Sequence, residues 1–228
     1  MSGRVTRKLA GETFGTFALV FAGTGAIIVN QASAGAVSHV GVALTFGLVV
    51  LAMIYALGDV SGCHLNPAVT IAFLIARRFE PLLVMPYVVC QCFGAILASL
   101  TLHLMFPDST TLGATLPAGD PLQSFVLEFI LTLILMFVIL SVSTGAKEKG
   151  LLAGVAIGAV IAFEALFAGP ISGASMNPAR SLAPALISGR FEHLWVYLAA
   201  PLLGAILAVA GCRCVQQPGC CSAKGACA

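Results

Sequence analysis

The sequence SGCHLNPA at residues 61–68 returns in altered form as SGASMNPA at residues 172–179. Each copy ends in Asn-Pro-Ala and leads into a short apolar segment, at residues 67–76 and 178–187. Proline is favoured at the first position of a helix, and asparagine directly before it caps the helix. Both segments are therefore predicted to be helices that begin at the Asn-Pro pair. They are too short to cross a bilayer, which takes about 20 residues.

The repetition extends beyond these two motifs. The sequence GAILA occurs at residues 94–98 and again at residues 204–208, and Glu12 in the first apolar run is matched by Glu128. Three elements in the same order, at offsets of 110 to 116 residues, indicate a duplication. The predicted repeats cover residues 7–105 and 121–213.

The composition indicates that the chain is surrounded by lipid rather than by water. Of the 228 residues, 59% are hydrophobic and only 9% are charged, whereas a soluble domain has roughly 25% charged residues. Six apolar stretches are long enough to span a bilayer, and they cover residues 9–29, 40–57, 82–104, 122–142, 151–168 and 194–212. The sequence predicts an all-α membrane protein, one channel domain over residues 1–228, with six transmembrane helices and two re-entrant half-helices.

The number of spans predicts how the repeats meet. Each repeat has three spans, so the second repeat enters the membrane upside down, and such inverted repeats place a functional site near the bilayer midplane. The two half-helices would meet there by their N-termini, where each helix dipole is equivalent to roughly +0.5 charge. Asn66 and Asn177 are expected to cap their helices through oxygen and to present their NH₂ groups to a passing solute. Such a pore passes neutral molecules and excludes ions and protons.

The basic residues predict the orientation. If the N-terminus is cytoplasmic, nine of the eleven Lys and Arg residues lie on the cytoplasmic side, as the positive-inside rule requires. The outside loops at residues 30–39 and 105–121 contain none. We therefore expect a multi-pass protein of the plasma (inner) membrane with both termini in the cytoplasm. The nine residues are Arg4, Arg7, Lys8, Arg77, Arg78, Lys147, Lys149, Arg213 and Lys224.

Other classes of function have little support. A net charge of +2 argues against a nucleic-acid partner. The four histidines are scattered over different segments, and no nucleophile–base pair, metal cluster or phosphate loop is evident. We expect neither an enzyme nor a bound cofactor. An ion-coupled secondary transporter is the alternative to a channel, because such transporters also use inverted repeats.

The extended motifs SGCHLNPAVT (61–70) and SGASMNPARS (172–181) resemble the paired motifs of the aquaporin family, also called major intrinsic proteins. The resemblance covers about residues 7–213, and residues 169–186 look most like the nodulin-26-like branch and its bacterial relatives. It implies a right-handed bundle that assembles in lipid as a homotetramer with one pore per subunit. It also implies that the pore motif consists of Asn66, Pro67, Ala68, Asn177, Pro178 and Ala179.

Members of this family narrow at four positions on the outer side, and the resemblance places this filter at Phe46, Ala165, Ala174 and Arg180. Arg180 would donate to solute oxygens and repel cations. Ala165 stands where strict water channels have His, so the resemblance implies a wider, more apolar constriction. The implied permeants are water and uncharged solutes such as glycerol, urea or metalloid hydroxides, including arsenite. Ser181 stands where dedicated glycerol facilitators have Asp, which favours a broad channel.

Several polar residues have more than one interpretation. Glu12 and Glu128 could relay protons, as carboxylates within membranes often do, but in this family they more often brace the re-entrant loops through hydrogen bonds. His64 is expected to line the inner vestibule, as a gate, a pH sensor or a hydrogen-bonded wall residue. Glu164 is either a polar strut or a pore-side acceptor, and Asp59 has no assigned role.

Five of the eight cysteines lie in the last 17 residues. The predicted tail, residues 214–228, would be cytoplasmic and therefore reduced, which argues against disulfides. Cys220, Cys221 and Cys227 could bind a soft metal or trivalent arsenic through thiolates, or the tail could simply be rich in cysteine. Cys63, just before the first Asn-Pro-Ala, has no assigned role.

Overall fold

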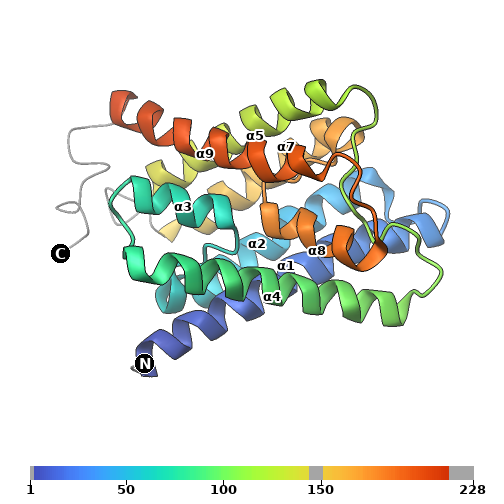
Figure 1. Ribbon diagram of the computed structural model, residues 1–228, viewed down its shortest axis with the longest axis horizontal. Helices are drawn as coiled ribbons and strands as arrows, with labels where there is room; N and C mark the ends of the chain where they lie inside the picture. Colours follow the sequence, from blue (N-terminus) through green and yellow to red (C-terminus); the bar gives the residue numbers. More distant parts are fainter. Residues whose placement is uncertain (1–2, 144–150, 216–228) are drawn as a thin grey trace.

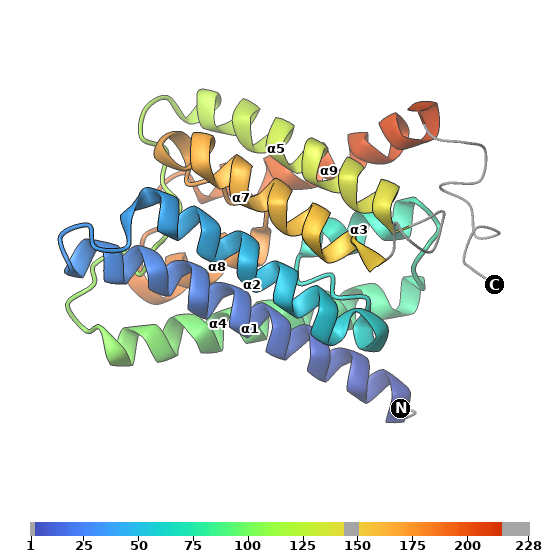
Figure 2. The ribbon, with the colours of Figure 1, turned by 180° about the vertical axis from the view of Figure 1, so that it is seen from behind.

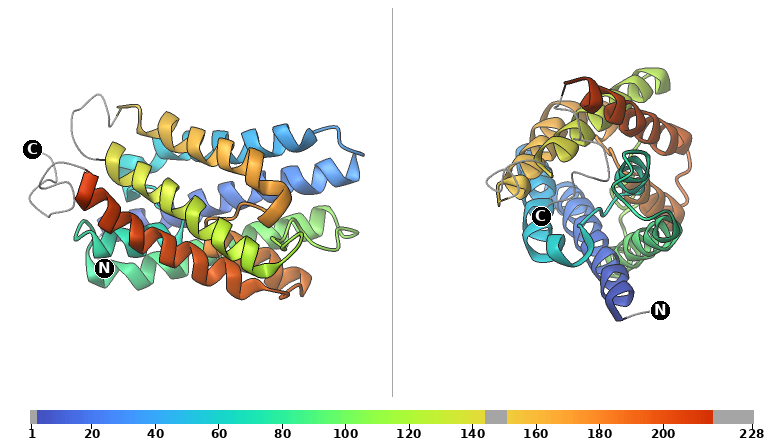
Figure 3. Two further views of the ribbon diagram at one scale, coloured as in Figure 1. Left: turned by 90° about the horizontal axis from the view of Figure 1, so that it is seen from above. Right: turned by 90° about the vertical axis from the view of Figure 1, so that its left-hand side faces the viewer.

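The computed structural model describes residues 3–143 and 151–215, and the helices in this part of the chain run mainly along the long axis of the molecule (Figures 1 and 3). Six of them are long and apolar enough to cross a membrane. The six are α1 (Gly3–Ala32), α2 (Ser38–Ser61), α4 (Pro81–Met105), α5 (Pro121–Val142), α7 (Ala153–Ser172) and α9 (Leu194–Val215). Two shorter helices, α3 (Pro67–Ile75) and α8 (Pro178–Ser188), begin at the predicted prolines. The predicted all-α membrane fold is confirmed.

The helices extend beyond several predicted boundaries. α1 begins at Gly3, before the predicted start of the first repeat at residue 7. α9 continues to Val215, so Cys214 and Val215 belong to this helix and not to the tail that was predicted from residue 214. Hydropathy reports how much of a helix contacts lipid, whereas backbone hydrogen bonds can continue through polar residues into water.

The packing of the helices follows the two repeats. In the first repeat α1 packs against α2 and α4, and in the second α5 packs against α7 and α9. α2 and α7 pack against each other where the repeats meet (Figure 2). Each short helix packs against its own repeat and against the other one, α3 on α4 and α9, and α8 on α9 and α4. The contacts of one repeat are thus reproduced by the other, as an inverted repeat requires.

The repeated GAILA sequence is explained by close helix contact. A Cβ atom at Gly94 in α4 would collide with the carbonyl oxygen of Thr13 in α1. A Cβ atom at Gly204 in α9 would collide in the same way with the carbonyl oxygen of Phe129 in α5. Glycine at such positions lets two helix backbones approach closely within a membrane.

The two ends of the bundle are distinct. The beginning of α1 and the end of α9 lie at the same end of the molecule (Figure 1). An even number of membrane spans has this consequence, and it agrees with the prediction that both termini face one compartment.

Candidate functional site

The two short helices are capped alike. Asn66 precedes Pro67 in α3, and its Oδ1 accepts a hydrogen bond of 2.9 Å from the backbone N–H of Ala68. Asn177 precedes α8, and its Oδ1 accepts from the backbone N–H groups of Ala179, at 3.0 Å, and Arg180, at 3.4 Å. These are N-cap interactions, so each asparagine side chain is held rigidly at the tip of its helix.

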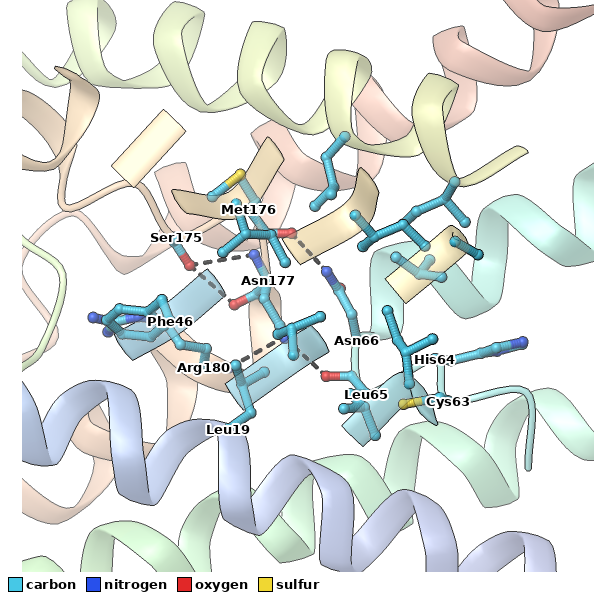
Figure 4. Close-up of a pocket in the computed structure, with 18 of the residues that line it drawn as sticks. Leu19, Phe46, Cys63, His64, Leu65, Asn66, Ser175, Met176, Asn177 and Arg180 are labelled. Atoms are coloured by element: carbon cyan, nitrogen blue, oxygen red, sulfur yellow. Dashed lines mark hydrogen bonds between the residues drawn. The ribbon is translucent and has the colours of Figure 1, made fainter. Parts of the chain in front are cut away.

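Each asparagine also binds the opposite loop (Figure 4). Asn66 Nδ2 donates to the carbonyl oxygen of Met176 at 2.7 Å, and Asn177 Nδ2 donates to the carbonyl oxygen of Leu65 at 2.8 Å. The tips of α3 and α8 therefore abut. The expectation that each whole NH₂ group faces the solute was wrong in part. One of its two hydrogens is used across the repeats, and one is left for a passing molecule.

The loops before the half-helices share an unusual backbone. Three residues of each loop have positive φ, and two of the three are not glycine, a conformation that costs about 1 kcal/mol or more for such residues. Such strain persists only where the surroundings hold the backbone in place. The matched pairs are Gly62 (84°) and Gly173 (86°), Cys63 (51°) and Ala174 (42°), and Leu65 (51°) and Met176 (54°).

Glu12 holds the first loop from within α1. Its Oε1 accepts from the Ser61 hydroxyl at 2.7 Å and the His64 N–H at 3.0 Å. Its Oε2 accepts from the Leu65 N–H and from Gln91 Nε2, both at 2.8 Å. The side chain is fully buried, so these bonds form in a medium of low dielectric constant, where they are strong.

Glu128 holds the second loop from α5 in the same way. Its Oε1 accepts from the Ser172 hydroxyl and from the Ser175 N–H, both at 2.8 Å. Its Oε2 accepts from the Met176 N–H at 2.8 Å. Of the two interpretations considered for these carboxylates, the contacts favour the bracing of the loops over proton relay.

One cavity runs past the asparagine pair. Phe46 and Arg180 lie on one side of the pair, which we call the filter end, and His64 lies on the other side, the vestibule end (Figure 4). Ala165 and Ala174 also line the cavity. The cavity has a volume of about 940 Å³, part of it open to solvent. The asparagine pair, the four predicted filter residues and His64 therefore share one cavity.

Arg180 is fixed at the filter end. It is 2% exposed, its guanidinium donates to the carbonyl oxygen of Gly113 at 2.9 Å, and its Cζ lies 5.2 Å from the centroid of the Phe46 ring. Within the described residues its Nε has no hydrogen-bonding partner. Arg180 also lines the cavity, where a guanidinium can donate to a solute oxygen and repel cations.

Sequence reasoning missed the residues that place this filter. A Cβ atom at Gly23 in α1 would collide with the Phe46 ring, so this glycine leaves the space that the ring fills. The loop between α4 and α5 supplies Gly113 and also Thr115, whose hydroxyl donates to the Ser181 hydroxyl at 2.8 Å. Neither the glycine nor the loop carries a repeated motif that would have marked it.

The repeat did contain a signal for two tyrosines. Tyr87 donates to the carbonyl oxygen of Ser61 at 2.8 Å, and Tyr197 donates to the carbonyl oxygen of Ser172 at 2.7 Å. Each tyrosine stands at the same distance before its GAILA sequence. Both therefore help to hold the start of a loop.

The remaining predicted residues are Glu164, Cys63 and the tail cysteines. Glu164 is fully buried, but within the described residues neither carboxylate oxygen has a hydrogen-bonding partner, and the residue does not line the cavity. It therefore fits neither the strut nor the acceptor interpretation. Cys63 lines the cavity as a free thiol. The tail cysteines Cys220, Cys221 and Cys227 lie outside the described residues, and the described part of the chain has no cluster of three metal-ligating side chains.

Comparisons with known proteins agree with this architecture. The family described as Major intrinsic protein matches residues 1–210. Aquaporin NIP1-1 of Oryza sativa subsp. japonica is 51% identical over 201 residues, which are 88% of this chain and 71% of that protein. Nodulin-26 of Glycine max is 47% identical over 201 residues, 88% of this chain and 74% of that protein. The X-ray structure of the aquaglyceroporin from Plasmodium falciparum has a TM-score of 0.77 and 26% identity, and the match covers 90% of this chain and 94% of that one.

These relatives confirm two predictions. They are aquaporin channels and not enzymes, and those of the nodulin-26 type agree with the branch that residues 169–186 resemble. The family match covers both half-helices and all six membrane spans except the last residues of α9. The chain belongs to the major intrinsic protein family of membrane channels.

Proposed function

We propose that this channel passes water and small uncharged solutes through one pore in each subunit and excludes ions and protons. The observation that carries the proposal is the cavity that joins the asparagine pair to the filter end. Two helix N-termini point at its centre, and a buried guanidinium stands at one end. All three features disfavour a cation in the pore, while each asparagine keeps one N–H for a solute oxygen.

The side chains of the filter favour solutes larger than water. Two of its four residues, Ala165 and Ala174, are alanines, so little bulk stands opposite Arg180 and Phe46. Glycerol, urea and neutral metalloid hydroxides such as arsenous acid are the proposed permeants besides water. The structural neighbour is an aquaglyceroporin, which supports glycerol among them.

The same proposal includes the setting of the channel. A homotetramer in the plasma membrane with cytoplasmic termini fits the family and the distribution of basic residues. In this orientation the filter end faces outward, and the vestibule end faces the cytoplasm.

Proteoliposomes test the proposal. Stopped-flow light scattering should show faster shrinkage in sucrose than empty liposomes show, and faster re-swelling with glycerol, urea or arsenous acid outside. Planar bilayers that contain the same protein should carry no ionic current above that of lipid alone. Solute uptake that required an ion gradient would instead favour a secondary transporter and contradict the proposal.

Ala165→His tests the filter. An imidazole at this position narrows the filter end, so we expect the ratio of water to glycerol permeability to rise, on the order of tenfold if the barrier for glycerol increases by about 1.4 kcal/mol relative to that for water. Ala165→Ser is the matched control, because it adds a polar group with little bulk. An unchanged ratio in Ala165→His would remove residue 165 from the filter.

A further inference from the structure

The hydroxyl group of Thr70, in α3, takes part in three hydrogen bonds. It donates to the carbonyl oxygen of Asn66 at 3.1 Å. Its Oγ1 also lies 3.0 Å from Gln91 Nε2 and 3.1 Å from His64 Nδ1. A hydroxyl has one hydrogen to donate and two lone pairs to accept with, so three contacts use its full capacity. The direction of each bond can therefore be worked out.

Two of the three directions are fixed by the partners. The carbonyl oxygen of Asn66 can only accept, so the Thr70 hydrogen is used there. Gln91 Nε2 also donates to the carboxylate Oε2 of Glu12 at 2.8 Å. If the Gln91 amide were flipped, its oxygen would face the carboxylate oxygen of Glu12, and neither atom could donate. The nitrogen of Gln91 is therefore correctly placed, and it donates to Thr70 as well. With all three contacts made as hydrogen bonds at once, the one between His64 and Thr70 is donated by His64.

This direction determines the tautomer of His64. A neutral imidazole carries one hydrogen, and here it resides on Nδ1. Nε2 is then a bare acceptor. Within the described residues, no hydrogen bond to Nε2 is present. The His64 ring stacks on the Phe73 ring, with centroids 4.7 Å apart and planes 22° apart, and its centroid lies 4.8 Å from that of the Phe79 ring.

The bare nitrogen lies at the vestibule end of the cavity. His64 lines this cavity, and in Figure 4 its ring projects away from the asparagine pair on the side opposite Phe46. A Cβ atom at residue 62 would lie 3.4 Å from Nε2, so Gly62 leaves that edge of the ring uncovered. Ile54, Val69 and Ile157 line the same cavity.

We propose that Nε2 of His64 is an acceptor subsite for the hydroxyl hydrogen of a permeating solute. This inference rests on the proposed function and adds a chemical class to it: solutes that accept from the asparagines and also donate a hydroxyl, such as polyols and neutral hydroxides. The asparagines offer donors, and Nε2 of His64 offers an acceptor in the same cavity. The second repeat has no equivalent, because Ser175 stands at that place and its hydroxyl donates to the carbonyl oxygen of Asn177.

Two substitutions separate this role from a structural one. His64→Asn can keep an N–H near the position of Nδ1 for Thr70 but has no acceptor at the position of Nε2. His64→Gln reaches the position of Nε2 with an acceptor oxygen and gives up the bond to Thr70. The loss of one neutral hydrogen bond to the solute changes a rate or an equilibrium constant by about twofold to tenfold. We expect glycerol permeability in proteoliposomes to fall by about that factor in His64→Asn and to be preserved in His64→Gln.

Glycerol permeability that fell in His64→Gln and was preserved in His64→Asn would overturn the subsite, because it would show that only the bond to Thr70 matters. The tautomer itself is measured by ¹⁵N NMR of the imidazole nitrogens in the wild-type protein at neutral pH, with the His64 signals assigned by their loss in His64→Asn or His64→Phe. We expect hydrogen on Nδ1 and none on Nε2. Hydrogen on Nε2 would overturn the inference even where the channel conducts. Absent solute flux in wild type, with hydrogen on Nδ1, would instead overturn the proposed function.

Discussion

The two loops that meet at the centre of the membrane have the same frame and different linings. Both have a buried glutamate, a tyrosine, three left-handed residues and a capping asparagine in matching places. The residue after Asn-Pro-Ala, however, is Val69 in the first repeat and Arg180 in the second. The frame has thus stayed symmetric, while the positive charge stands at one end only.

The rest of the filter shows the same contrast. At the offset of the two motifs, Phe46 corresponds to Ile157 and Ala165 corresponds to Ile54, and all four line the cavity. The vestibule end thus has aliphatic side chains where the filter end has an aromatic ring and an alanine. Residues that must be equal in both repeats build the fold, and residues that differ between them are the candidates for selecting the solute.

The largest expected effect concerns the braces. Glu12→Leu leaves four buried donors without an acceptor, and Glu128→Leu leaves three. Each unpaired buried donor costs about 1–3 kcal/mol, so both variants should lose several kcal/mol of stability, and Glu12→Leu should lose more. The melting temperature in detergent and the yield of monodisperse protein measure this. A milder effect at Glu12 than at Glu128 would contradict the comparison.

Substitutions that disturb the close helix contacts should lower stability equally in the two repeats. Gly94→Ala and Gly204→Ala each push a Cβ atom against a neighbouring backbone, and overpacking of this kind costs about 1–3 kcal/mol. Gly211→Ala in α9 is the control, because a Cβ atom there meets nothing within 4 Å. Thermal unfolding of the three variants checks the symmetry, which fails if only one repeat is sensitive.

A substitution at Glu164 should instead stabilise the protein. Glu164 corresponds to Met53 at the offset of the motifs, and it is buried without a hydrogen-bonding partner among the described residues. Removing an unpaired buried polar group should gain about 1–2 kcal/mol, so Glu164→Met should raise the melting temperature. Met53→Glu is the reverse change in the other repeat and should lower it. A lower melting temperature for Glu164→Met would show that the carboxylate has a favourable role.

The smallest expected effect comes from the tyrosines. Tyr87→Phe and Tyr197→Phe each remove one buried hydrogen bond to a loop carbonyl, which is worth about 1 kcal/mol. Tyr55→Phe removes an exposed bond to the carbonyl of Leu151 and should have less effect. Equal shifts in melting temperature for Tyr87→Phe and Tyr197→Phe, larger than that of Tyr55→Phe, would support the shared frame, whereas a shift in only one of the pair would not.

Much of this architecture could be predicted from the sequence because it repeats. Two copies of Asn-Pro-Ala in an apolar chain predict paired half-helices, and the matched Glu12 and Glu128 mark the residues that hold them. Features without a second copy escaped prediction. Gly23 makes room for Phe46 across two helices, and Gly113 reaches Arg180 from a loop with no distinctive pattern.

The sequence also could not predict which partners the asparagine N–H groups bind. A side chain with two N–H groups can serve the solute, the opposite loop or both, and only the distance between the tips of α3 and α8 decides among these. The structure brings Asn66 Nδ2 to 2.7 Å from the carbonyl of Met176, which assigns one hydrogen to the protein. Composition and spacing carry no information about such a distance.

We expect a solute to pass between Asn66 and Asn177 and to bind the one N–H that each of them retains. An experimental density map of the protein in a lipid nanodisc, with glycerol present and at a resolution that shows ordered water, tests it most directly. We predict density for water or glycerol within hydrogen-bonding distance of both Nδ2 atoms, in line with the filter end and the vestibule end. Asparagine side chains that face lipid, or a solute path that bypasses them, would show that the pore does not run between the two half-helices.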